Sequence, residues 1–162
     1  MTARHDSVLL HFFVRWFLVP FILLFALYVL VHGELSPGGG FQGGAIFAAG
    51  LILARLSLGA DGERGLFTRD VLVTLAAAGL GIFAFTGVAA MAFGADYLDY
   101  GAVPFEWIDK VWPGELSRRQ IGIFIIEGGI ATAVFATLML LFDYLTERDP
   151  GAHDPEVNEG GA

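Results

Sequence analysis

Four long runs of apolar residues restrict what this 162-residue chain can fold into. A helix of about 20 apolar residues crosses the hydrocarbon core of a bilayer, which is about 30 Å thick. Charged residues are almost absent from the runs and gather between them and at the chain ends. The pattern predicts an all-α integral membrane protein with four transmembrane helices, at about 12–31, 37–58, 71–93 and 121–142.

The four spans make up one predicted membrane domain, residues 1–145. The remaining residues, 146–162, are polar, acidic and rich in glycine, a composition typical of a disordered tail. Between the third and fourth spans, the connection carries Trp107 and Trp112. These aromatic residues suit a short helix at the membrane interface, although an irregular loop fits them nearly as well.

Proline and glycine shape the first two spans. Pro20 is expected to kink the first span, because proline removes a backbone donor and clashes with the preceding turn. The clearly apolar part of the second span, 45–58, is too short to cross a bilayer at about 1.5 Å per residue. With Ser36 as N-cap and Pro37 as first helical residue, the span reaches the necessary length, and its glycines then lie inside the membrane.

The distribution of lysine and arginine predicts the orientation. With a cytoplasmic N-terminus, six of the nine basic residues fall on the inside, and the positive-inside rule then favours this arrangement. Both termini are therefore predicted to be cytoplasmic. The inside set is Arg4, Arg15, Arg55, Arg64, Arg69 and Arg148, and the outside set is Lys110, Arg118 and Arg119.

Composition argues against several kinds of site. A formal charge of −8 is unsuited to nucleic acid, and the absence of cysteine removes thiolate metal sites. The four histidines show no paired ligand spacing, so neither a metal site nor a cofactor is expected. Gly38, Gly40 and Gly43 match G-x-G-x-x-G, but membrane helices flank them instead of a βαβ unit, which excludes a dinucleotide site.

The glycine-rich start of the second span has two interpretations. Gly40, Gly44 and Ala48 recur every four residues and form a smooth stripe on which another helix can pack closely. Alternatively, the glycines leave the backbone open to a water-filled cavity, and the polar Gln42 suits either interpretation. The residues assigned to helix packing or an ion pathway are Pro37, Gly38, Gly39, Gly40, Phe41, Gly43 and Gly44.

Glu127 is the most informative single residue, because it lies about six positions into the fourth span. A carboxylate at that depth is costly, so it should face protein or water and not lipid. Glu127 is therefore a candidate for an ion pathway, together with Gln42. The alternative is a structural carboxylate that bonds to its neighbours. No residue is expected to be catalytic.

Two segments resemble the MnhB/MrpB family, whose members are small subunits of Mrp-type multisubunit Na+/H+ antiporters. One is 32–44, with the sequence HGELSPGGGFQGG, directly after the first span. The other is 121–129, with the sequence IGIFIIEGG, an isoleucine-rich helix with one embedded carboxylate. The P-G-G-G-F-x-G-G segment is specific to the family, and the likeness extends over most of the chain.

The resemblance implies a non-enzymatic membrane subunit of a hetero-oligomeric complex in the prokaryotic plasma (inner) membrane. Such complexes exchange cytoplasmic Na+, or another monovalent cation, for external H+, and their large subunits carry the proton channels. The same module occurs in membrane-bound hydrogenases and related respiratory complexes, which leaves a purely structural role there as the alternative. Expected partners are the other subunits, Na+, H+ and the lipid bilayer.

Overall fold

The computed structural model describes residues 11–33, 39–58, 67–94, 96–99 and 115–146. Within these residues it contains four helices long and apolar enough to cross a membrane, which confirms the predicted all-helical, four-span architecture. The first is continuous from His11 to Val31 and includes a π-helical segment, η1 (Val14–Leu18), followed by α2 (Val19–Val31). The others are α3 (Gly39–Leu58), α4 (Arg69–Ala92) and α6 (Glu115–Thr146).

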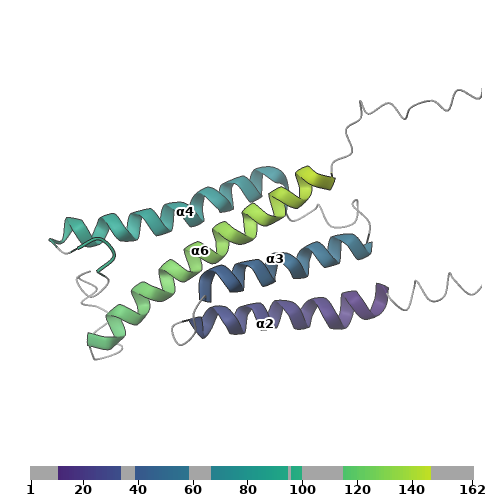
Figure 1. The fold of residues 1–162 in the computed structure, drawn as a ribbon, viewed down its shortest axis with the longest axis horizontal. Helices are drawn as coiled ribbons and strands as arrows, with labels where there is room; N and C mark the ends of the chain where they lie inside the picture. The colour runs from purple at the N-terminus through teal and green to yellow at the C-terminus, as the bar shows by residue number, and fades with distance from the viewer. Residues whose placement is uncertain (1–10, 34–38, 59–66, 95, 100–114, 147–162) are drawn as a thin grey trace, which may run out of the picture.

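The helices are arranged in the spatial order α4, α6, α3, α2 (Figure 1). α6 crosses between α4 and α3, and α3 in turn packs between α6 and α2. α3 and α6 run in the same direction, whereas α2 and α4 run the opposite way. The described chain therefore begins at His11 and finishes at Thr146 at the same end of the molecule, on the right in Figure 1.

The helix bounds differ from the predicted spans mainly in α6. The predicted fourth span, 121–142, was closed by Asp143, but α6 continues to Thr146 and begins as early as Glu115. Asp143 does not end the helix, because its charge is paired inside the protein with Arg55 of α3. Pro37 and Gly38, the predicted first turn of the second span, lie outside the described residues, as do the tail 147–162 and both tryptophans of the outer connection.

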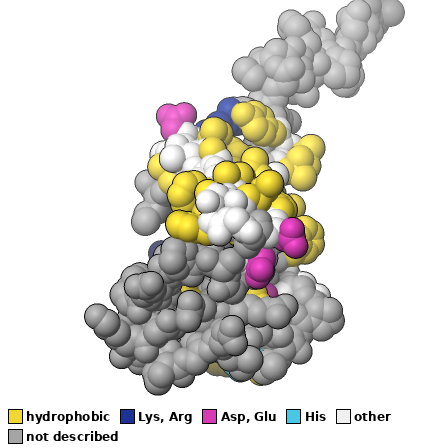
Figure 2. Space-filling model, turned by 90° about the vertical axis from the view of Figure 1, so that its left-hand side faces the viewer, with side chains coloured by type: hydrophobic (Ala, Val, Ile, Leu, Met, Phe, Trp, Pro, Cys, Tyr) yellow, Lys and Arg dark blue, Asp and Glu magenta, His cyan; other side chains and the backbone are white. Residues whose placement is uncertain are grey.

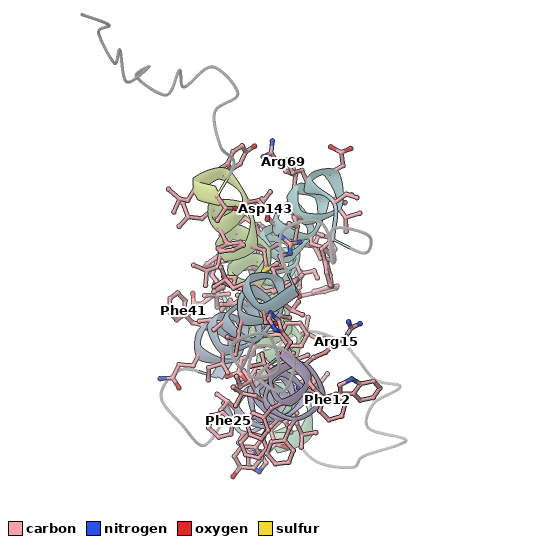
Figure 3. All side chains as sticks on the ribbon, turned by 90° about the vertical axis from the view of Figure 1, so that its right-hand side faces the viewer. Phe12, Arg15, Phe25, Phe41, Arg69 and Asp143 are labelled. Atoms are coloured by element: carbon pink, nitrogen blue, oxygen red, sulfur yellow. The ribbon has the colours of Figure 1, made fainter. Side chains whose placement is uncertain are left out.

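The expected effect of Pro20 takes the form of a π-helical turn. The Val19 N–H donates to the carbonyl of Val14, five residues back, just before the proline. Proline has no N–H and its ring crowds the carbonyl four residues before it, so a locally wider helix accommodates it. Arg15 lies in this segment, and its side chain points away from the other helices (Figure 3).

The main core lies where α3, α4 and α6 meet. Its buried members are Ala48, Leu72, Phe135, Ala136 and Met139. The ring of Phe135 is edge-on to two other rings, those of Phe47 in α3 and Phe67 just before α4. Close packing of this kind supplies dispersion contacts, which stabilise helix association in lipid where the hydrophobic effect is weak.

The outward faces of the helices are strongly apolar. Phe12, Phe25 and Phe41 point away from the helices around them (Figure 3), and each side chain is largely exposed. Seen along the helices from the opposite end, the described surface is again mainly hydrophobic, with acidic side chains at a few places (Figure 2). Such a surface suits contact with lipid chains or with other membrane helices.

Candidate functional site

Glu127 of α6 meets two glycines where α2 ends and α3 begins. A Cβ placed on Gly33 would lie 2.5 Å from Oε2 of Glu127, and one on Gly39 would lie 2.7 Å from Oε1. Gly33 follows the last turn of α2, and Gly39 is the first described residue of α3. Gly33, Gly39 and the Glu127 carboxylate, which we call the Glu127 site, therefore join three of the four spans.

Only glycine fits at both backbone positions of this site. The Cα atoms of Gly33 and Gly39 lie so close together that a Cβ on either residue would collide with the other. Both glycines are buried, whereas Glu127 is partly exposed. The carboxylate thus takes the space that a side chain at 33 or 39 would fill. It also lies next to backbone instead of in the hydrocarbon, where a charged group is costly.

The start of α3 provides an electrostatic reason for a carboxylate here. The first backbone N–H groups of a helix have no partner within the helix, and the helix dipole places partial positive charge at this end. Anionic side chains near the first turn are therefore stabilised. The oxygens of Glu127 lie beside Gly39, in that first described turn.

The glycine stripe of α3 packs on the backbone of α6. A Cβ on Gly40 would lie 2.6 Å from the carbonyl oxygen of Glu127, and one on Gly44 would lie 2.5 Å from that of Ala131. These are backbone atoms, which cannot turn away as a flexible side chain can. The two helices therefore approach each other through their main chains, as small residues allow in membranes.

The remaining motif residues divide between two other faces of α3. Gly43 packs on α2, where its Cβ would lie 3.1 Å from that of Leu30. Phe41 and Gln42 are both exposed. At about 100° per residue, Gln42 is roughly 200° around the helix from Gly40. The structure therefore does not bring Gln42 together with Glu127.

An apolar cavity of about 190 Å³ lies between α2, α3 and α6, on the side of Glu127 toward the middle of the spans. Its polar lining includes the hydroxyl of Thr132, which already donates to the carbonyl of Gly128 at 2.8 Å. The cavity is therefore poorly suited to carry an ion. The other lining residues are Ala26, Leu27, Leu30, Gly43, Gly44, Phe47, Ala131 and Phe135.

Sequence reasoning missed a buried ion pair at the other end of α3 and α6. Arg55 Nη1 donates to Oδ1 of Asp143, and Arg55 Nη2 donates to the carbonyl of Phe67 at 3.1 Å. The side chains are only 5% and 13% exposed. In sequence, these two charges looked like markers of span ends. Their common depth at one end of two spans is the signal that could have suggested the pair.

Nothing among the described residues resembles a metal centre, since no group of three or more His, Cys, Asp or Glu side chains is placed to hold an ion. The described site is a single carboxylate held by backbone at the junction of three membrane helices. It therefore defines a small multi-pass membrane protein with one intramembrane acid.

Comparison with known proteins identifies the family. Residues 9–140 match the family described as "Domain related to MnhB subunit of Na+/H+ antiporter", and the chain belongs to this family. The resemblance seen in the sequence is thus confirmed. No solved structure shows a significant match.

Three relatives illustrate the similarity. The chain is 31% identical to an Na(+)/H(+) antiporter subunit of Bacillus subtilis over 75% of its own length and 86% of that protein. It is 31% identical to the Na(+)/H(+) antiporter subunit of the same name from Alkalihalophilus pseudofirmus, over 83% and 94% of the two chains. It is 35% identical to the putative antiporter subunit mnhB2 of Staphylococcus aureus, over 75% and 87%.

Proposed function

We propose that this protein is a membrane subunit of a multisubunit antiporter that exchanges a monovalent cation, Na+ in the first instance, for H+. The family and the names of its relatives support this assignment. The subunit supports assembly of the complex in the prokaryotic plasma (inner) membrane, and Glu127 lines part of an ion pathway. The exposed apolar faces of all four spans suit contact with other subunits.

The observation that carries the proposal is the position of the Glu127 carboxylate. It lies within a span, is partly exposed, and is held by glycine backbone at the start of α3. Intramembrane carboxylates commonly take part in proton relays or ion pathways, because they can bind and release a proton. The surrounding backbone holds the group in place without a bulky side chain that would block access to it.

A scaffold role is the alternative, either in the antiporter or in a related hydrogenase-type complex. In that case the Glu127 site only ties α6 to the turn between α2 and α3. A neutral amide could make the same tie, because it also accepts and donates hydrogen bonds. The two interpretations therefore differ in whether the group at residue 127 must ionise.

The test compares Glu127→Gln with Glu127→Asp in the complete complex. If the site conducts ions, Glu127→Gln impairs antiport or alters its pH dependence, whereas Glu127→Asp retains part of the activity. Antiport is measured against pH in everted vesicles, with subunit content checked by blotting. Asp96→Asn is the matched control, because it removes one carboxylate from an exposed position near the end of α4. Normal abundance and an unchanged pH profile in Glu127→Gln would leave only the scaffold role.

Two further parts of the proposal need separate tests. The purified subunit alone, reconstituted in liposomes, should not exchange Na+ for H+, because the large subunits are expected to carry the channels. Measurable exchange by this chain alone would contradict the accessory role. Both termini are proposed to be cytoplasmic, and reporter fusions at each end check this orientation.

A further inference from the structure

α3 and α6 form a parallel pair whose contacts keep one register along their length. Gly40 lies against Glu127, Gly44 against Ala131, and Arg55 pairs with Asp143. The partners in these three contacts are separated by 87 or 88 residues in the chain. At about 1.5 Å per residue, Glu127 and Asp143 are about 24 Å apart along α6. The ion pair and the Glu127 site thus lie far apart on the same interface.

The glycine part of this interface does not define its own register. Glycines allow close approach, but they have no side chains that interlock with the facing helix. A slide of one helical turn would move α3 by about 5.4 Å along α6. It would carry Gly39 away from Glu127, so the carboxylate would no longer meet the two glycines. The register therefore decides whether the Glu127 site exists.

Arg55 is suited to hold this register. Its two terminal nitrogens point to different partners, the Asp143 carboxylate and the Phe67 carbonyl. The planar guanidinium fixes both directions at once, whereas the single ammonium of lysine does not. Asp143 belongs to α6, and Phe67 precedes α4 with its ring against Phe135. Arg55 consequently ties α3 to α6 and to the entry of α4.

Burial makes the pair selective for one arrangement. A slide or rotation would separate two largely buried charges, and an unpaired charge in such a place is strongly unfavourable. Buried polar pairs are well attested as devices that specify helix register. We propose that Arg55 and Asp143 are positioning residues, which set the α3–α6 register and thereby hold Glu127 between Gly33 and Gly39. The functional part of this inference rests on the proposed role of Glu127, but the register part does not.

The test uses the complete complex with substitutions at the ion pair. Arg55→Lys keeps the charge but loses the two-way fork, and Asp143→Asn removes the charge of the partner. The double variant Arg55→Asp with Asp143→Arg restores an ion pair in the reverse sense. Arg15→Lys is the matched control, since Arg15 is an exposed arginine toward the same end of the molecule.

Register is measured directly by the distance between spin labels on Phe41→Cys and Phe124→Cys. Both side chains are mostly exposed, at 62% and 51%, so the labels do not disturb the core. The chain has no cysteine of its own, and complexes without the two substitutions give the background from other subunits. Antiport against pH is recorded on the same preparations.

We expect the two single variants to broaden or shift the label distance by up to about 5 Å, one helical turn. Their pH profile should change in the same sense as that of Glu127→Gln. The double variant should recover both properties at least in part, and Arg15→Lys should change neither. An unchanged distance in both single variants overturns the register role.

A changed distance with an unchanged pH profile, at normal complex abundance, overturns the positioning of a functional Glu127. The proposed function fails by a different result, namely normal antiport in Glu127→Gln. If Asp143→Asn fails to assemble, Arg55→Lys still tests the inference, because it leaves no partner without a facing cation.

Discussion

Replacing Gly40 with alanine adds a single methyl group where α3 and α6 approach most closely. The new Cβ would lie 2.6 Å from the carbonyl oxygen of Glu127 and 3.0 Å from its Cα. Ordinary van der Waals contact begins at 3.4 Å, so the methyl group is about 0.8 Å too close. Since the atoms it meets are backbone, the two helices must move apart.

The cost follows from two opposing effects. Overpacking a well-packed interface costs about 1–3 kcal/mol. Alanine recovers up to about 1 kcal/mol, because it favours the helix more than glycine does. Gly81→Ala in α4 provides the matched control, since no atom lies within 4 Å of its Cβ and only the favourable effect remains. The difference between the two variants therefore isolates the packing cost, about 1–3 kcal/mol.

The assay is the apparent melting temperature of the complex in detergent, read from the loss of a fluorescently tagged subunit from its size-exclusion peak. A change of 1 kcal/mol corresponds to roughly 2–4 °C for a chain of this size. Gly40→Ala should therefore melt several degrees below Gly81→Ala, and Gly40→Leu should fail to assemble. Gly128→Ala is a second control on α6, next to Glu127 but facing open space.

Equal melting temperatures for Gly40→Ala and the two control variants would refute the packing explanation. It would mean that the interface yields to the methyl group without cost. Equal antiport activity in intact Gly40→Leu complexes would refute it still more directly.

Three further substitutions test other contacts by the same melting assay. Gly79→Ala should destabilise the complex as much as Gly40→Ala, because its Cβ would lie 2.5 Å from the carbonyl oxygen of Gly129 and would push α4 away from α6. Gly87→Ala should cost less, because the group in its way is the ring of Tyr97, a partly exposed side chain that can move; a loss as large as for Gly79→Ala would contradict this. Phe135→Ala should cost about 3–5 kcal/mol, since it removes a buried ring with two edge-on aromatic contacts, and an unchanged melting temperature would show that the core does not depend on it.

The sequence by itself determined the four helices. In a bilayer core, backbone N–H and C=O groups find no water, so an apolar run of sufficient length must form a helix that satisfies them internally. The cost of a buried charge singled out Glu127, and the four-residue spacing of Gly40 and Gly44 indicated a smooth face on one helix. These inferences hold because each depends on one segment and its solvent.

Only the tertiary structure decided which helices meet. The spacing of Gly40 and Gly44 does not say that the facing helix is α6, that it runs parallel, or that Glu127 lies opposite Gly40. Likewise, nothing local to Gly33 shows that a carboxylate 94 residues later occupies the space beside it. The pairing of Arg55 with Asp143 joins two ends that the sequence treats as separate boundaries. The physical reason is that helix periodicity fixes which side chains share a face, whereas the choice of partner and register depends on how all the spans pack together.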